Sequence, residues 1–141
     1  MSDTNHFTQR ASFTSWTRET CRYGDTDRQG HINNAVFATF CESGRVALLA
    51  EGADTPGPPG CAFVIVRLVI DFRVELLWGD VVDIGTAVVR VGKSSLALAQ
   101  GLFRGEQCVA TSESVLVLMD ETTRRATPLP PALRASLAGA G

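Results

Sequence analysis

The sequence carries no excess of charge of one sign: its 141 residues include 13 Lys and Arg against 15 Asp and Glu, a formal net charge of −2. Nucleic acid is therefore not expected as a partner, because proteins that bind it need a basic surface. Charged residues make up 20% and apolar residues 45% of the chain, proportions typical of a globular protein. At this length we expect one domain, spanning residues 1–141, with a core of its own.

Long hydrophobic runs are also missing. A membrane-spanning helix needs about 20 consecutive, mainly apolar residues, and no run in this chain approaches that length. The N-terminal segment MSDTNHFTQR does not have the charged and then apolar layout of a signal peptide. We therefore expect no membrane partner and a cytoplasmic location.

Cysteine pairs are a third absence. The chain has four cysteines, and each is isolated in the sequence: Cys21, Cys41, Cys61 and Cys108. Without a CxxC pair, neither a structural zinc site nor a disulfide framework is expected, so the cysteines are predicted to be reduced.

What is present begins with one segment of helical spacing, from Asn34 to about Glu51. Apolar or small residues recur in it every three or four positions, namely Phe37, Phe40, Cys41, Gly44 and Leu48. Glu42 and Arg45 lie three residues apart on another side and are predicted to form an ion pair. Because further apolar residues fill the remaining directions, we expect a core helix that is covered on most sides.

Alternating apolar and polar residues indicate strands in the rest of the chain. A mixed, threonine-rich run over residues 13–23 is predicted to be an edge strand. Four longer runs follow a proline- and glycine-rich loop at residues 52–60, and they cover residues 64–75, 81–91, 96–103 and 108–119. The short turns between them predict antiparallel neighbours. The tail from about residue 130 is expected to be flexible apart from a short helix over residues 132–137.

This inventory predicts an α+β fold in which a curved antiparallel sheet wraps around one long central helix. One sheet cannot enclose a helix completely, so the uncovered side predicts self-association, either through the helix-bearing surface or by extension of the sheet. In the run over residues 96–103, Ala97, Ala99 and Gly101 share one face, which would let another element approach closely.

The polar cluster DTDRQGHINN, which precedes the helix, has several interpretations. A turn followed by a helix cap is one, with Gly30 in an unusual backbone conformation and Asn33 as the cap. A metal site made of Asp25, Asp27 and His31 is another, but no second set of ligands follows in the sequence. A Ser-His-Asp triad is disfavoured, because no segment resembles a nucleophile elbow.

Acyl-transfer chemistry is a further interpretation of the cluster. The N-terminus of a helix presents unpaired backbone N–H groups that can polarise a carbonyl and stabilise an oxyanion. A carboxylate a few residues earlier could attack that carbonyl or activate a water. The spacing between Asp27 and the helix start near Asn33 and Asn34 therefore supplies both halves of a hydrolytic site.

The segment Tyr23–Arg45, YGDTDRQGHINNAVFATFCESGR, resembles the signature of the hotdog-fold acyl-CoA thioesterases of the 4-hydroxybenzoyl-CoA thioesterase type. That signature runs aromatic-x-D-x-D-x-x-G-H-[IV]-N-N-A, then an aromatic residue, then Glu and Arg on the helix. The rest of the chain fits by the order of its elements. The resemblance implies the hotdog fold, a long helix wrapped by an antiparallel sheet, and assembly into homodimers and often homotetramers.

The resemblance also implies roles for residues of the cluster. The family's catalytic carboxylate matches Asp27, which would act as nucleophile or general base on a thioester carbonyl, without metal or organic cofactor. The family's oxyanion donor, a backbone N–H, falls on Asn34. His31 and Asn33 are placed where they could orient the loop, the substrate or the water, with capping and loop fixation as the alternative. Asp25 is expected to hold the turn.

Contacts with the substrate follow from the same resemblance. Coenzyme A carries a 3′-phosphate and a pyrophosphate, so basic side chains and backbone amides are expected near it. By position along the fold, the nucleotide is expected near a turn that contains Arg90, Lys93, Ser94 and Ser95, with a solvated hairpin turn as the alternative. Gly30 and Phe37 are further predicted substrate contacts, and the acyl pocket is expected to include Phe37, Phe40 and Phe63, or else these are plain core. Arg67, Arg73 and Arg104 are interpreted as ordinary strand or turn charges.

The expected function is hydrolysis of an acyl-CoA thioester to a free carboxylic acid and coenzyme A. An acyl-carrier-protein thioester is an alternative substrate, because plant thioesterases of that kind share a similar D-x-N-x-H-[IV]-N-N run, although Gln29 replaces its asparagine. A non-catalytic acyl-CoA-binding protein and an enzyme that hydrates or dehydrates an enoyl thioester are two further alternatives.

Overall fold

The computed structural model describes residues 5–50 and 57–139. The described elements are η1 (Asn5–Thr8), η2 (Arg10–Ser12), β1 (Ser15–Thr20), η3 (Tyr23–Asp25), α1 (Asn34–Leu49), β2 (Cys61–Phe72), β3 (Val81–Val91), β4 (Ser95–Arg104), β5 (Gln107–Asp120) and α2 (Pro131–Ala138), where η denotes a 3-10 helix. No described helix is long and apolar enough to cross a membrane. The α+β class and the short C-terminal helix are confirmed, whereas most of the predicted loop at residues 52–60 lies outside the described residues.

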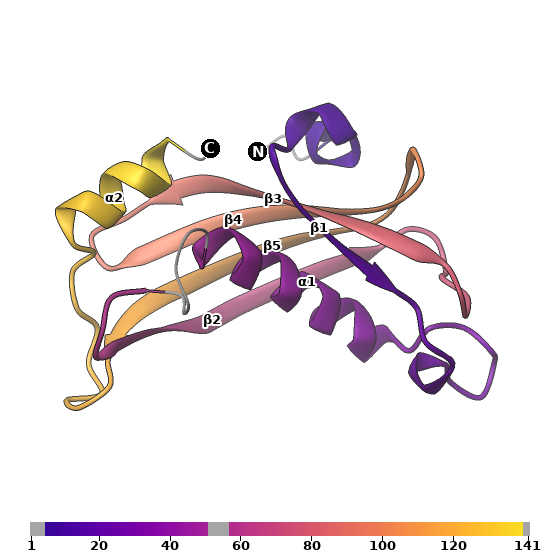
Figure 1. Ribbon diagram of the computed structural model, residues 1–141, viewed down its shortest axis with the longest axis horizontal. Coiled ribbons are helices and arrows are strands. Elements are labelled where there is room, and N and C mark those ends of the chain that lie inside the picture. The colour runs from indigo at the N-terminus through magenta and orange to yellow at the C-terminus, as the bar shows by residue number, and fades with distance from the viewer. Residues whose placement is uncertain (1–4, 51–56, 140–141) are drawn as a thin grey trace.

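The five strands form one antiparallel sheet in the order β1-β3-β4-β5-β2. β1 lies at one edge, as predicted, and β2 lies at the other. β1 is shorter than the run over residues 13–23 because the chain leaves the sheet after Thr20 and turns into η3. Figure 1 shows α1 lying across one face of this sheet, which is the hotdog arrangement of one long helix and one antiparallel sheet.

The alternation predicted for β2 is interrupted by a bulge. The register with β5 shifts between Ile65 and Arg67, so Val66 is an extra residue in the ladder. Ile65 therefore pairs with Leu116, and Leu68 pairs with Ser114. Leu116 and Ser114 are both buried on the helix side of the sheet, so Ile65 and Leu68 also share one face. The strict period of two assigned Ile65 and Leu68 to opposite faces, and this part of the prediction was wrong.

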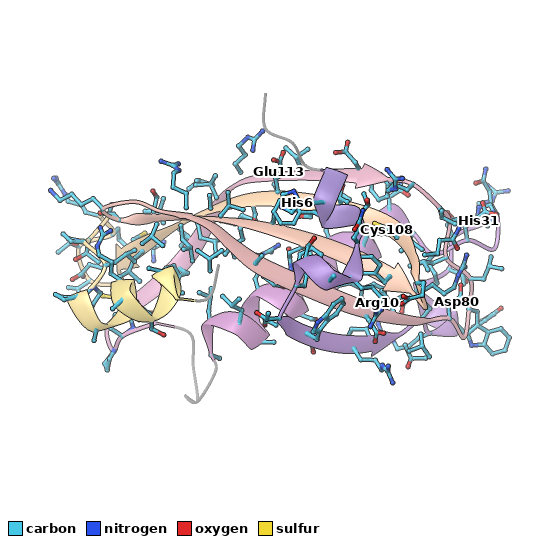
Figure 2. The ribbon with its side chains drawn as sticks, turned by 90° about the horizontal axis from the view of Figure 1, so that it is seen from above. His6, Arg10, His31, Asp80, Cys108 and Glu113 are labelled. Carbon is cyan, nitrogen blue, oxygen red and sulfur yellow. The ribbon has the colours of Figure 1, made fainter. Side chains whose placement is uncertain are left out.

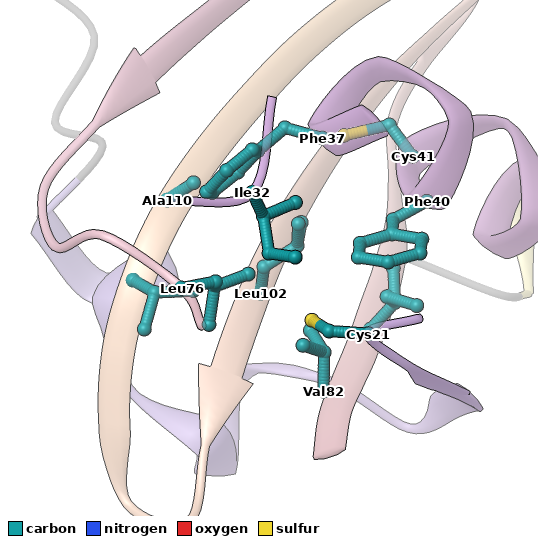
Figure 3. Packing of buried hydrophobic residues seen from close by; sticks show 11 residues of the cluster. Cys21, Ile32, Phe37, Phe40, Cys41, Leu76, Val82, Leu102 and Ala110 are labelled. Carbon is teal, nitrogen blue, oxygen red and sulfur yellow. The ribbon is translucent and has the colours of Figure 1, made fainter. Parts of the chain in front are cut away.

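The core lies between α1 and the sheet. Figure 3 shows Phe37, Phe40 and Cys41 of α1 directed toward strand residues such as Val82 and Leu102. All five of these side chains are at least 95% buried. Helix and sheet are thus joined by a continuous apolar layer, and burial of this area is the main force that holds α1 in place.

Coverage of α1 within one chain is less complete than the sequence predicted. The face directed at the sheet is buried, but Glu42, Val46 and Ala47 are exposed on the other side. The expectation of a helix covered on most sides is wrong for the single chain. The predicted ion pair between Glu42 and Arg45 is also absent, since Arg45 turns inward and donates to Gln100 instead.

The N-terminal segment packs on the face of the sheet opposite α1, where Phe7 and Phe13 contact β3 and β4. A side-chain carbon on Gly101 would lie 2.7 Å from the carbonyl oxygen of Phe7 and 2.9 Å from the ring of Phe13. Arg10 fixes the segment through Asp83, at 3.1 Å, and through cation–π contact with Trp16. The close approach expected over the small residues of β4 is therefore confirmed at Gly101.

Candidate active site

The loop before α1 is a tight hairpin. Thr26 and Ile32 form an isolated bridge, and the backbone N–H of Asp27 donates to the carbonyl oxygen of His31 at 2.8 Å. Gly30 has φ of +83°, a backbone conformation that side chains disfavour, as the turn interpretation required. Ile32 is buried and donates to the carbonyl oxygen of Leu76, which ties the hairpin to the segment after β2.

Asp25 anchors the base of this hairpin. Its carboxylate accepts hydrogen bonds from the backbone N–H of Arg22 at 3.0 Å and from the Arg22 guanidinium at 2.8 Å. The guanidinium, through that hydrogen bond, holds the pKa of Asp25 below its usual range. The carbonyl oxygen of Asp25 also accepts from the N–H of Asn33. The structural role expected for Asp25 is confirmed.

The Asp27 carboxylate is held by one oxygen only. Oδ1 accepts from the backbone N–H groups of Gln29, at 2.9 Å, and His31, at 3.3 Å. Oδ2 makes no hydrogen bond to any residue that the structure describes, and the side chain is exposed. One oxygen thus fixes the orientation of the group, and the other is accessible for chemistry.

Helix α1 begins at Asn34, as predicted. Asn33 is its N-cap, and its side-chain Oδ1 accepts from the backbone N–H of Ala35 at 2.9 Å. The N–H of Val36 donates to the carbonyl oxygen of Asn33. Within residues 5–50 and 57–139, the structure shows no acceptor for the N–H of Asn34. This donor lies at the positive end of the helix and is accessible to an incoming oxygen.

Asp27 and Asn34 line the same cavity, of about 300 Å³. Its other lining residues are Gln29, His31, Ile32, Phe37, Phe72, Arg73, Val74 and Glu75. The structure therefore brings together four of the predicted site residues, Asp27, His31, Asn34 and Phe37. Asn33 and Gly30 act on the cavity through the cap and the turn rather than as lining residues.

Two charged side chains of this cavity were not singled out by the sequence. Glu75 lies 3.2 Å from the imidazole Nε2 of His31, so the two side chains fix each other. Arg73, which was interpreted as an ordinary charge, is exposed at the same cavity and brings a cation to it. The only sequence signal for either residue was its place at the end of β2, whose position beside the Asp27 loop is a property of the tertiary fold.

The predicted nucleotide-binding turn lies elsewhere in the chain. Arg90, Lys93, Ser94 and Ser95 belong to the connection between β3 and β4, and the Asp27 loop lies beside the other end of β3. The 11 residues of β3 separate the two places by roughly 35 Å at about 3.3 Å per residue. In Figure 2, His31 and Asp80 lie at one end of the molecule and α2 at the other. A single chain therefore does not bring this turn to Asp27.

The other two predicted acyl-pocket residues lie in different parts of the molecule, away from the Asp27 cavity. Phe40 lies in the core beneath α1, which is its plain structural interpretation. Phe63 lines a second cavity of about 320 Å³ between α1 and β2. A third cavity, of about 1060 Å³, has no titratable side chain among its lining residues and offers no group for acid–base chemistry.

Cysteine chemistry has little support at this site. Cys21 is 1% exposed, and burial raises its pKa to about 11, so its thiol stays protonated at neutral pH. Burial likewise raises the pKa of Cys41, beneath α1. Neither buried thiol is therefore favoured as a nucleophile.

Comparison with known proteins assigns the family. A model described as the thioesterase-like superfamily matches residues 21–137. The chain belongs to this family. Membership confirms the resemblance to the hotdog-fold thioesterases and the expected class of thioester hydrolases, whereas the 4-hydroxybenzoyl-CoA type remains a prediction.

Individual relatives agree with that membership. A 1,4-dihydroxy-2-naphthoyl-CoA hydrolase of Synechococcus elongatus is 27% identical over 118 residues, which cover 80% of this chain and 87% of the hydrolase. A Thermus thermophilus thioesterase, whose structure contains coenzyme A and Zn, is 30% identical with a TM-score of 0.76, covering 89% of this chain and 98% of that one. A Pseudomonas aeruginosa protein has the same fold, with a TM-score of 0.84, 24% identity and 94% of each chain covered.

Proposed function

We propose that this thioesterase-like protein hydrolyses an acyl-CoA thioester to a free carboxylic acid and coenzyme A. The observation that carries the proposal is the meeting of the Asp27 carboxylate and the Asn34 N–H at one cavity. Coenzyme A as the thiol half is supported by the Synechococcus relative, which is named as a CoA hydrolase, and by the coenzyme A in the Thermus structure.

The chemistry follows from these two groups. With the thioester carbonyl oxygen at the Asn34 N–H, negative charge that develops on that oxygen is stabilised by the donor and the helix dipole. As a nucleophile, Asp27 Oδ2 forms a tetrahedral adduct that expels the thiolate and leaves a mixed anhydride for water to cleave. As a general base, Asp27 takes a proton from the water that attacks the carbonyl carbon. Both routes release the acid and the thiol.

Neighbouring residues position these groups. The backbone N–H of His31 donates to Asp27, and the His31 ring is fixed by Glu75. Phe37, which is 2% exposed, contacts Phe72 with ring centroids 5.1 Å apart and forms an apolar wall of the cavity. We assign His31 and Asn33 to orientation of the loop and the helix start, and Asp27 and Asn34 to the reacting carbonyl.

The test is Asp27→Asn. Asparagine keeps the oxygen that accepts from Gln29 and His31, so the loop should retain its shape while the nucleophile or base is lost. We expect release of free thiol from an acyl-CoA panel to fall about 100-fold or more. Glu121→Gln, at an exposed acid outside β2 and outside the cavity, is the matched control and should retain full activity.

Two outcomes would contradict the proposal. Full hydrolysis by the Asp27→Asn variant would remove Asp27 from the mechanism. A thermal shift with coenzyme A but no thiol release by the unmodified protein would instead favour a non-catalytic acyl-CoA-binding protein.

We also propose that the protein self-associates along β2, as a homodimer or as a tetramer of two dimers. β2 is an edge strand whose outer backbone groups have no neighbouring strand in the described chain. Apolar side chains are exposed along it and on the adjacent side of α1: Val46, Ile65, Val66, Leu68 and Phe72. Antiparallel pairing of two such edges would cover this surface.

Self-association would also account for the distant nucleotide-binding turn. Antiparallel pairing along β2 reverses the second copy, so its turn at Lys93 would lie toward the same end of the assembly as the Asp27 loop of the first copy. We therefore retain Arg90, Lys93, Ser94 and Ser95 as proposed nucleotide contacts supplied from one copy to the other. The lysine and the hydroxyl groups match the phosphates of coenzyme A.

A further inference from the structure

The C-terminal segment after β5 packs against the turn at residues 92–94, which joins β3 to β4. In Figure 1, α2 lies at the end of the sheet where this turn is found. Leu129 and Leu137 are each 4% exposed, and Leu137 belongs to the same apolar cluster as Leu96 and Leu98 of β4. The segment is therefore held on this end of the sheet by its own buried side chains.

Two successive carbonyl oxygens of the turn accept hydrogen bonds from this segment. The guanidinium of Arg134 in α2 donates to the carbonyl oxygen of Gly92 at 2.6 Å, across 42 residues of sequence. The backbone N–H of Leu129 donates to the carbonyl oxygen of Lys93 at 2.9 Å. The first of these bonds is short and has a charged donor, which makes it the stronger of the two.

The same two bonds set the direction of the turn's amide groups. The described peptides are trans, and in a trans peptide the N–H points to the side opposite the carbonyl. The N–H groups of Lys93 and Ser94 therefore face away from the C-terminal segment. Within residues 5–50 and 57–139, neither N–H has an acceptor. Two successive N–H groups beside the exposed ammonium of Lys93 match the oxygens of a phosphate.

Arg134 acts on the turn from its inner side. The side chain is half-buried and forms no ion pair with any acid in the part of the chain that the structure describes. Its bond goes to the backbone, on the carbonyl side of the peptide between Gly92 and Lys93. A charged donor at a carbonyl polarises the peptide and strengthens the N–H on the other side as a donor. Arg134 can thus improve an anion site that it does not touch.

We propose that Arg134 is a positioning residue for the phosphates of the substrate's thiol half. It holds the turn so that the N–H groups of Lys93 and Ser94 face outward and receive phosphate oxygens. This role rests on the proposed hydrolysis, in which the turn of one copy serves the Asp27 site of another, and it gives the C-terminal helix a part in that site. Because Arg134 contacts neither Asp27 nor Asn34, it acts on capture of the substrate and not on the reaction at the carbonyl.

Two other roles for Arg134 predict different results. A purely structural role would lower thermal stability and affect every substrate alike. A general attraction by positive charge would be shared by the other exposed basic side chains at this end of the sheet, which are Arg90, Arg124 and Arg125.

Two substrates with the same acyl group separate these roles. One is the CoA thioester that the unmodified protein cleaves fastest, and the other is the matching N-acetylcysteamine thioester, which keeps the reacting group and has no phosphate. In Arg134→Met, KM for the CoA thioester should rise at least fivefold while kcat stays within a factor of two. For the N-acetylcysteamine thioester, kcat/KM should stay within a factor of two. Arg134→Lys keeps a cationic donor and should recover part of the loss.

Arg125→Met is the matched control, because it removes a positive charge from the same end without a side-chain bond to the turn. It should change KM for the CoA thioester less than twofold. Thermal unfolding shows that each variant is folded. If Arg134→Met does not fold, Arg134→Gln, which keeps a neutral N–H donor, carries the same comparison and should raise that KM at least twofold.

Calorimetric titration with coenzyme A makes the test independent of hydrolysis. We expect saturable binding to the unmodified protein and at least fivefold weaker binding to Arg134→Met. The same pair of affinities without thiol release from any thioester would contradict the proposed hydrolysis and support the role of Arg134 in holding the turn.

Other results would overturn the role of Arg134. Normal hydrolysis with an unchanged KM in Arg134→Met would do so and leave the proposed hydrolysis standing. An equal loss with both thioesters would show a structural role, and an equal loss in Arg125→Met would show general attraction by charge. Absence of coenzyme A binding by the unmodified protein would remove the phosphate site itself.

Discussion

At the scale of single residues, two carboxylates two positions apart have different surroundings. Asp25 is 6% exposed and is fully engaged by Arg22, whereas Asp27 is exposed and keeps one oxygen without a hydrogen bond. The D-x-D pattern thus combines an anchor with a reactive group. The backbone accounts for the difference, because η3 directs the first carboxylate inward and the hairpin directs the second toward the cavity.

The anchoring role predicts acid sensitivity. Arg22 lowers the pKa of Asp25 in the folded protein, so the stabilisation is complete above the unfolded pKa of about 4 and is lost as pH falls through the lowered folded value. Asp25→Asn should destabilise the protein by about 1 kcal/mol at pH 7, a modest effect because Arg22 is mostly exposed. Urea unfolding at pH 7 and at stepwise lower pH measures this difference.

The difference in stability between Asp25→Asn and the unmodified protein should shrink as pH falls below about 4, where the unfolded aspartate becomes protonated. It should vanish below the lowered pKa of the folded protein, where the aspartate is protonated in both states. The same measurement on Asp71→Asn should show little difference at any pH. A gap that stays constant between pH 7 and pH 3 would mean that the charge of Asp25 does not stabilise the fold.

At the scale of elements, α1 approaches the sheet closely at one point. A side-chain carbon on Gly44 would lie 2.7 Å from Gln100 Nε2 and from Ile84 Cγ2, and 2.8 Å from Thr86 Oγ1. The contact brings the helix backbone within reach of Gln100, which in turn positions Arg45. The helical spacing identified Gly44 as part of the buried face, but its neighbours come from strands 40 or more residues away.

Gly44→Ala should therefore destabilise the protein. Alanine favours a helix by about 1 kcal/mol over glycine, but overpacking in a filled core typically costs about 1–3 kcal/mol, and here the neighbours lie on two packed strands. We expect a net loss of about 1 kcal/mol or more in urea unfolding. Thr39→Ala, at an exposed position of the same helix, should change stability by less than about 0.5 kcal/mol. A more stable Gly44→Ala variant would show that the helix can move away from the sheet at little cost.

At the scale of the whole molecule, the single chain leaves two surfaces incomplete. One side of α1 is exposed, and β2 has no neighbour on its outer side. Both lie together at one edge, so one interface could cover them. The predicted nucleotide contacts at the far end of β3 point to the same conclusion, because a reversed second copy brings such a turn toward the Asp27 end.

Val66→Lys tests this interface. Val66 is 59% exposed at the bulge of β2, so a lysine is tolerated in a monomer but places like charges together in a symmetric pair. We expect the mass measured by light scattering to fall toward that of one chain. Val89→Lys, at a residue of β3 that is 56% exposed, should leave the mass unchanged. A single-chain mass for the unmodified protein at the same concentration would rule out the interface.

The sequence alone determined the features that depend on local backbone rules. The helix start at Asn34, the cap at Asn33, the turn at Gly30 and the order of strands and helices follow from neighbours a few residues apart. The tertiary structure decided which strands are adjacent, and it decided the bulge at Val66, which changes the face of the sheet on which part of β2 places its side chains. It also decided the burial of Arg45 and the place of Arg73 at the same cavity as Asp27. These features depend on contacts between residues far apart in the chain, where register and packing outweigh local pattern.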